Sequence, residues 1–339
     1  MKTDPGPSVA RGPVAVVGDG GWGTALALVL HRKGVATRLW SREPDYAAEM
    51  RRARANPRFL PGVALPEGLL VTGDPAEALD GAALVISAVP AQFVRGTWTD
   101  LAPFLRRGVP VCSVTKGIEI ATLERPTRIL AEVLGPRPLA VLSGPSHAEE
   151  VSRGMPCAVV AASRSPRLAA AVQGLFSTER FRVYSLRDVV GVEFAGAAKN
   201  VVAVAAGITD GLGLGDNTKA ALITRGAVEM ARLGRAVGAR QATFHGLAGI
   251  GDLIVTCASR HGRNRAVGER LARGERLDEI LASVRTVAEG VPTSKALVAL
   301  TRRLRVEMPI ATEVHHVLFD GKDPRRAVTD LMLRAPKKE

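Results

Sequence analysis

A glycine-rich turn near the N-terminus limits what this chain can fold into more than any other segment. The hexapeptide GDGGWG at residues 18–23 fits the pattern G-x-G-x-x-G. It follows the short apolar run Val14–Val17, a predicted strand, and it opens an apolar helix predicted from Thr24 to Lys33. A strand, a glycine turn and a helix in this order predict the start of a parallel α/β sheet that binds a dinucleotide.

Each glycine of this turn has a separate physical task. Gly18 permits the tight turn, Gly20 lets a pyrophosphate approach the backbone, and Gly23 lets the helix pack closely on the strand. The N-terminus of the following helix then offers free N–H groups and a partial positive charge to the phosphates. A glycine turn that serves only to connect strand and helix remains the alternative interpretation.

The residues that follow the second predicted strand, 35–40, bear on the choice of cofactor. An acidic residue here would bind the ribose 2′-hydroxyl of NAD, whereas an arginine would pair with the 2′-phosphate of NADP. The chain has both, Arg42 and Glu43. We expect NADP(H) to be preferred, with NAD(H) possible, although Arg42 as an ordinary surface charge is the alternative.

Apolar runs and helical segments alternate through the first half of the chain. Further buried strands are predicted at 83–89, 109–114, 139–142 and 157–161, a helix at 44–54, and a loop rich in proline and glycine at 57–68. Strands without polar alternation that are separated by helices predict a parallel sheet covered on both faces.

The second half of the chain reads almost entirely as helix. Helices are predicted at 190–207, 217–237, 263–273, 293–304 and 309–318. A length of 339 residues also exceeds what one core usually organises. We therefore predict an α/β fold in two parts: a Rossmann-type doubly wound domain over residues 13–187 and an all-helical domain over residues 188–335.

Charge and composition exclude several kinds of function. The net charge is +13, but the basic residues are dispersed and aromatic residues make up only 4%, too few for a base-stacking surface. No apolar run is long enough to cross a bilayer, no signal core is present, and the three cysteines form no CxxC pair. We expect a cytoplasmic protein that is not an integral membrane protein and that has no nucleic-acid partner and no metal site.

Two lysines stand where a charge is unusual. Lys116 ends a buried strand, on the side of a parallel sheet where ligands bind. Lys199 interrupts the apolar helical segment 194–206, so its ammonium must face a cleft, a partner or a ligand. Desolvation and a second nearby ammonium would lower the pKa of Lys199 enough for proton exchange near neutrality.

A second glycine turn and a basic segment follow in the helical half. Asp252, after the turn at 245–251, is either a helix N-cap or an active-site carboxylate. Arg263 and Asn264 lie at the predicted start of a helix. The positive charge and paired N–H donors of the arginine guanidinium, together with the free backbone N–H groups of the helix, suit a phosphate there. A solvent-exposed basic turn is the alternative interpretation.

These motifs, in this order, resemble the bacterial glycerol-3-phosphate dehydrogenases over about residues 13–335. The resemblance implies reversible reduction of dihydroxyacetone phosphate to sn-glycerol 3-phosphate with NAD(P)H, a supply of backbone for glycerophospholipids, and a homodimer. It is carried by the segments Gly18–Leu26, Ser113–Glu119, Ser143–Glu150, Glu193–Gly207, Gly246–Cys257, Arg263–Arg265 and Glu289–Gly290.

The resemblance also implies a role for each matching residue. Lys199 would exchange the proton at the carbonyl, Lys116 would add positive charge there, and Asp252 would orient Lys199. The implied substrate contacts are Lys116, Gly144, Ser146, Lys199, Asp252, Gly262, Arg263 and Asn264. The implied cofactor contacts are Gly18, Gly20, Gly21, Trp22, Gly23, Arg42, Lys116, Ala148, Arg263, Val287 and Glu289.

Two positions depart from the family pattern. Gly262 stands where the family often has serine, which removes a hydroxyl from the phosphate site, and His147 stands where it often has phenylalanine. A β-hydroxyacid dehydrogenase, which would need a carboxylate site in place of Arg263 and Asn264, is the competing enzyme hypothesis. A nucleotide sensor without turnover is the non-enzymatic one.

Overall fold

The computed structural model describes residues 12–259, 261–284 and 286–336, which divide into two compact units. The first unit comprises the described residues up to Thr115 together with Arg125–Glu193, and the second comprises Lys116–Glu124 together with the chain from Phe194 onward. The division at 193 lies inside helix α8 (Val189–Gly211), later than the predicted division at 187.

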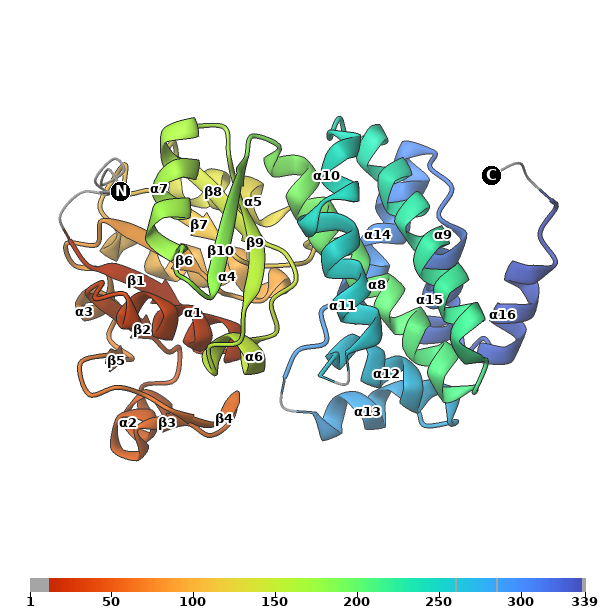
Figure 1. Ribbon diagram of the computed structural model, residues 1–339, viewed down its shortest axis with the longest axis horizontal. Helices are drawn as coiled ribbons and strands as arrows, with labels where there is room; N and C mark the ends of the chain where they lie inside the picture. Colours follow the sequence, from red (N-terminus) through yellow and green to blue (C-terminus); the bar gives the residue numbers. More distant parts are fainter. Residues whose placement is uncertain (1–11, 260, 285, 337–339) are drawn as a thin grey trace. The chain divides into compact units, whose positions relative to one another are not determined.

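The described strands of the first unit form an eight-stranded sheet in the order β10-β9-β8-β7-β6-β1-β2-β5 (Figure 1). The order reverses beside β1, as in doubly wound folds, and the glycine turn follows this central strand. The strands are β1 (Val14–Val17), β2 (Thr37–Trp40), β5 (Leu70–Thr72), β6 (Leu84–Ser87), β7 (Val111–Ser113), β8 (Leu139–Ser143), β9 (Cys157–Ser163) and β10 (Phe181–Leu186).

Both faces of the sheet are buried, because alternate strand residues enter two separate cores. Val14 and Val16 belong to a core that also contains residues of α1 (Gly21–Arg32) and α7 (Pro166–Phe176). Ala15 and Val17 belong to the core with α3 (Pro75–Leu79), α4 (Val94–Leu101) and α5 (Pro126–Leu134). Helices on both faces explain why the strands carry no polar alternation.

Several features of the first unit differ from the prediction. β9 runs antiparallel to β8, so the sheet is not wholly parallel, and β5 and β10 were not predicted. The predicted loop at 57–68 contains β4 (Leu60–Ala64), which pairs with β3 (Ala55–Asn56) after α2 (Pro44–Ala53). This short hairpin forms despite its proline and glycine because it pairs with only one partner strand.

Among the described residues of the second unit all regular structure is helical, as predicted. α8 is followed by α9 (Gly215–Ala236), α10 (Gln241–His245), a π-helical turn (Leu247–Gly251), α11 (Asp252–Ala258), α12 (Arg263–Ala272), α13 (Leu277–Ser283), α14 (Gly290–Leu304), α15 (Pro309–Phe319) and α16 (Pro324–Met332). The short helix α6 (Ala148–Ser152) belongs to the first unit.

Helix α8 is the core of the helical unit. It crosses α12 in backbone contact: a Cβ on Gly207 would lie 1.9 Å from the Arg265 carbonyl oxygen, and one on Gly268 2.0 Å from that of Val204. By length and composition α8 alone, among the described residues, could span a membrane, which corrects only the expectation that no apolar run is long enough to do so. Its apolar stretch is 94% buried within the protein, as core helices of folded domains are.

Candidate active site

The predicted site residues divide between the two units. In the first unit, the glycine turn has the geometry that each glycine predicts. Gly18 has φ +112°, and a Cβ there would lie 2.7 Å from the Ala88 carbonyl oxygen. A Cβ on Gly23 would lie 2.0 Å from the Gly18 carbonyl oxygen, so only glycine allows α1 to start this close to β1.

The same turn leaves room and donors for a phosphate. A Cβ on Gly20 would meet no described atom within 4 Å, whereas one on Gly21 would lie 2.6 Å from the Phe59 carbonyl oxygen. No side chain caps the first turn of α1. Trp22 stacks on Phe181, and its buried indole N–H has no hydrogen-bond partner among the described residues. An open approach and uncapped donors fit a pyrophosphate at this helix N-terminus.

Gly144, Ser146 and Ala148 lie after strand β8, an interior strand of the sheet. Gly144 has φ +143°, and a Cβ there would lie 2.9 Å from the Cα of Val159. Ser146 Oγ donates to the Gly144 carbonyl oxygen at 2.9 Å, and Ala148, the first residue of α6, packs against the core that contains α1. The loop is thus fixed by strand packing and by its own hydrogen bond.

The helical unit brings three predicted residues into direct contact. Lys199 Nζ donates to Asp252 Oδ1 at 2.8 Å, and Lys116 Nζ donates to Asp252 Oδ2 at 2.7 Å. The side chains of Asp252 and Lys199 are almost fully buried, while that of Lys116 is 17% exposed. One carboxylate therefore holds two ammonium groups, one of them deep in the protein.

Burial decides the protonation behaviour of this cluster. It lowers the pKa of Lys199 to about 8, against the attraction of Asp252 and with the help of the Lys116 ammonium. Burial alone would raise the pKa of Asp252, but the two ammonium groups hold it below its ordinary value. The cluster thus pairs an ionised carboxylate with a lysine that can lose and regain a proton near neutrality.

The structure excludes one of the two interpretations of Asp252, the helix N-cap. Gly251 occupies the N-cap position of α11, and the Asp252 carboxylate binds the two lysines instead of a backbone N–H group. The N-cap interpretation is therefore wrong. Asp252 reaches the lysines because the π-helical turn before α11 places it at the start of the helix with its side chain buried.

Two polar residues complete the cluster and were not predicted as site residues. Thr256, one turn after Asp252, accepts from Lys199 Nζ at 2.6 Å and donates to the Asp252 carbonyl oxygen at 2.6 Å. Asn200 donates to the Lys116 carbonyl oxygen at 3.0 Å. Asn200 was visible in the sequence as the other polar residue of an apolar helix, whereas nothing marks Thr256 except its spacing from Asp252.

The candidate phosphate site adjoins this network. Asn264 Nδ2 donates to Asn200 Oδ1 at 3.0 Å, and Asn264 Oδ1 accepts from the Gly290 N–H at 2.9 Å. Arg263, the first residue of α12, is exposed, and no side chain caps that helix. A Cβ on Gly262 would lie 2.9 Å from the Thr256 carbonyl oxygen, so a serine there would need a shift of this backbone.

The structure also places three further predicted cofactor residues. Val287 is exposed, Glu289 stands at the N-cap position of α14, and Arg42 is exposed after β2. Among the described His, Cys, Asp and Glu residues, no group of three or more is arranged to hold a metal ion.

The glycine turn on a doubly wound sheet and the buried lysine cluster are together typical of nicotinamide-dependent dehydrogenases. Comparison with known proteins identifies the family. The family model described as NAD-dependent glycerol-3-phosphate dehydrogenase N-terminus matches residues 13–169, and the corresponding C-terminus model matches residues 188–329. The chain belongs to the NAD-dependent glycerol-3-phosphate dehydrogenase family, as its motifs predicted.

Individual relatives agree over nearly the whole chain. Proteins named glycerol-3-phosphate dehydrogenase [NAD(P)+] are 51% identical in Geobacter sulfurreducens and 46% identical in Chlorobium phaeobacteroides, each over 96% of this chain and 98% of the relative. The crystal structure of glycerol-3-phosphate dehydrogenase from Coxiella burnetii is 39% identical, with a TM-score of 0.93, and covers 96% of this chain and 99% of that chain. The predicted combination of a Rossmann-type sheet and a helical domain is confirmed.

Proposed function

We propose that this chain catalyses the reversible reduction of dihydroxyacetone phosphate to sn-glycerol 3-phosphate with NADPH or NADH. The names of its full-length relatives support the substrate and the cofactor. The single observation that carries the proposal is the buried contact of Lys199 with Asp252, beside Lys116. A ketone reductase needs a proton donor that is charged at neutral pH and able to discharge, and few buried lysines meet both conditions.

Lys199 acts as the proton donor in this proposal. A reduced nicotinamide held by the glycine turn would supply the hydride that the carbonyl carbon needs, and would itself be oxidised to NAD(P)+. As the carbonyl oxygen gains negative charge, the Lys199 ammonium donates a proton to it, which leaves the neutral amine and the alcohol. In the reverse direction the neutral amine takes the proton from the alcohol. A pKa of about 8 makes both directions accessible near neutrality.

Lys116 and Asp252 support the proton transfer in different ways. Lys116 places a second positive charge beside the Lys199 ammonium, which favours release of the proton and stabilises negative charge on the substrate. Asp252 fixes both ammonium groups through its two oxygens, and Thr256 gives Lys199 a second partner. The amine is therefore held in one position by two neighbours before any substrate binds.

The phosphate of the substrate would bind at the start of α12. Arg263 supplies a planar, permanently charged donor, and the first N–H groups of α12 add the partial positive charge of the helix. Asn264 has its carbonyl oxygen engaged by Gly290, so its amide group is held in a fixed orientation. Anchoring the phosphate fixes the carbonyl and supplies the proximity contribution to catalysis.

The glycine turn, Trp22 and Ala148 would hold the cofactor in the first unit, with the pyrophosphate at the N-terminus of α1. Family resemblance further supports a cytoplasmic homodimer whose product supplies the backbone of glycerophospholipids. A preference for NADP(H) is part of the proposal, and Arg42 is the residue that first suggested it.

A spectrophotometric assay with dihydroxyacetone phosphate, run with NADPH and with NADH, tests the activity directly. Lys199→Met removes the proton donor at nearly constant length, so kcat is expected to fall by roughly a hundredfold to ten-thousandfold, with affinity for the nucleotide retained. Lys219→Met, which removes another lysine ion pair in the same helical unit, is the matched control and should keep kcat near the wild-type value. Rapid turnover by Lys199→Met would contradict the proposed role.

A further inference from the structure

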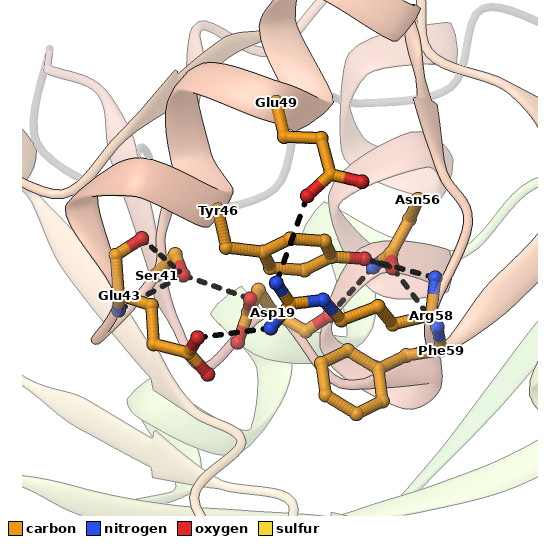
Figure 2. Close-up of polar contacts among 8 residues, drawn as sticks. All are labelled: Asp19, Ser41, Glu43, Tyr46, Glu49, Asn56, Arg58 and Phe59. Carbon is orange, nitrogen blue, oxygen red and sulfur yellow. Dashed lines mark hydrogen bonds and ion pairs between the residues drawn. The ribbon is translucent and has the colours of Figure 1, made fainter. Parts of the chain in front are cut away.

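The end of β2 carries both an arginine and a glutamate, and the sequence alone does not show which one governs the cofactor. In the structure the Glu43 carboxylate is already engaged. Arg58 Nη1 donates to Glu43 Oε2 at 2.9 Å, and Arg58 Nη2 lies 3.6 Å from Glu49 Oε2 (Figure 2). Arg58 comes from the connection between β3 and β4, which was predicted as a loop.

This ion pair lies where the adenosine ribose binds in doubly wound folds. The ribose in such folds sits at the end of the second strand, beside the glycine turn. Here Ser41, the residue after β2, donates from its hydroxyl to Asp19 Oδ2 of the glycine turn at 2.8 Å. Figure 2 shows the Arg58 guanidinium beside Asp19. Burial raises the pKa of Asp19, and the positive charge of Arg58 opposes part of that rise.

The backbone around Arg58 is fastened to the glycine turn. Asn56 Nδ2 donates to the Asp19 carbonyl oxygen at 2.7 Å and to Thr24 Oγ1 at 2.8 Å. The Tyr46 hydroxyl donates to Asn56 Oδ1 at 2.6 Å and accepts from the backbone N–H of Arg58 at 3.0 Å. Asn56 and Tyr46 are both buried. The hairpin therefore holds the Cα of Arg58 in a fixed position relative to the phosphate-binding turn.

The side chain of Arg58, in contrast, can change partners. It is 34% exposed, and its partners Glu43 and Glu49 are 61% and 44% exposed. Ion pairs this exposed are worth little, because water competes for both charges. The Arg58 guanidinium lies 3.9 Å from the centre of the Tyr46 ring, in a cation–π contact that leaves the guanidinium N–H groups free to form hydrogen bonds. A phosphate dianion would compete well with Glu43 and Glu49 for the paired N–H donors of the Arg58 guanidinium.

We propose that Arg58 is the residue that selects the 2′-phosphate of NADP(H), with Glu43 and Glu49 holding its guanidinium beside the ribose site until the phosphate displaces them. This inference rests on the proposed function. It also explains the mixed signal of the sequence: Glu43 binds Arg58 and is thereby unavailable as the ribose acid that NAD sites use. Arg42, exposed after β2, adds charge nearby but makes no hydrogen bond or ion pair with another described residue.

Binding of two small nucleotides to the full chain tests the proposal without turnover. Calorimetric titration compares 2′,5′-ADP, which carries the 2′-phosphate, with 5′-AMP, which lacks it. The wild-type protein should bind 2′,5′-ADP at least about tenfold more tightly, and Arg58→Gln should reduce that ratio by roughly tenfold or more, the effect expected from losing a charge-assisted fork. Arg58→Lys should restore part of it, because the charge returns without the fork.

Matched variants separate this role from a structural one. Arg52→Gln removes an exposed arginine of α2 and should leave the ratio unchanged. Glu43→Gln releases Arg58 and should raise the affinity for 2′,5′-ADP above that of the wild type. This variant also keeps the proposal testable if Arg58→Gln fails to fold, which its melting temperature would reveal.

The possible failures are distinguishable. A wild-type protein that binds neither nucleotide and reduces no dihydroxyacetone phosphate would overturn the proposed function, and this inference with it. A protein that binds both nucleotides with a ratio near one would overturn the role of Arg58 alone. The same holds if the ratio survives in Arg58→Gln and is lost only in Arg42→Gln.

Discussion

Replacing Asp252 with asparagine is the sharpest test of the buried cluster. The substitution keeps the size of the side chain and removes the charge that Lys116 and Lys199 share. Lys199 would then keep Thr256 as its charge-neutral partner in a buried place. Because Asp252 is the main group that raises the pKa of Lys199, the variant should have a Lys199 pKa well below about 8.

The expected loss of stability follows from linkage and depends on pH. In the wild-type protein Lys199 already releases its proton near pH 8, whereas an unfolded lysine does so near 10.5. If the pKa falls below 6 in the variant, the added cost from Lys199 is between about 1 and 2 kcal/mol at pH 7 and between about 2 and 3 kcal/mol at pH 6. In this pH range the native state of the wild type holds more protons on Lys199 than the native state of the variant. Lowering the pH therefore stabilises the folded wild type relative to the folded variant.

Urea denaturation of both proteins at pH 8, 7 and 6 measures this difference. The difference in unfolding free energy between the wild type and Asp252→Asn should widen as the pH falls. That difference should no longer depend on pH when Lys199→Met is added to both proteins. The kcat for ketone reduction should fall in parallel, since the neutral amine has no proton to give. A gap that stays constant between pH 8 and 6 would show that Asp252 does not control the protonation of Lys199.

Three further outcomes are expected. Arg263→Ala should raise KM for dihydroxyacetone phosphate by roughly tenfold or more with little change in kcat, and an unchanged KM would argue against a phosphate contact. Glu229 accepts a hydrogen bond from the Ile310 N–H at 2.8 Å, and burial raises its pKa from an ordinary 4.5 to about 7. The folded protein should therefore lose about 3 kcal/mol of stability as the pH rises from 4.5 to 7, because the native state holds the Glu229 proton more tightly than the unfolded state does. Glu229→Gln should abolish that loss in thermal unfolding measured at a series of pH values. Gly268→Ala would place a Cβ 2.0 Å from the Val204 carbonyl oxygen, so it should destabilise the protein by about 1 to 3 kcal/mol or more in urea, whereas Ala266→Ser on the same helix should change little.

The parts of the fold that could be predicted from sequence are those specified by local chemistry. Within the turn at 18–23, Gly23 meets a steric requirement imposed by the turn itself, because a Cβ there would lie 2.0 Å from the Gly18 carbonyl oxygen, and the spacing of the motif was enough to predict it. Lys199 was recognisable because a charge in an apolar helix has few explanations. The division of the chain into an α/β half and a helical half could be predicted from the periodicity of its apolar residues alone.

The parts that could not be predicted depend on contacts between distant segments. The antiparallel pairing of β8 with β9 has no signature in residues 139–163, because a buried strand reads the same in either direction. The contact of Asn264 with Asn200 joins residues 64 positions apart. Arg58 was hidden in a segment that proline and glycine marked as a loop, and only the hairpin brings it back to Glu43.

The segment Lys116–Glu124 is inserted in sequence between β7 and α5 of the nucleotide-binding unit, yet it folds with the helical unit. A helical fragment that begins at Phe194 would keep Lys199 and Asp252 but lose Lys116. Domain swaps between homologues must therefore transplant two separate pieces of chain. A chimera joined only inside α8 would pair the Lys116 of one parent with the carboxylate of the other, and recombination at that junction is expected to be tolerated only where both parents agree at these positions.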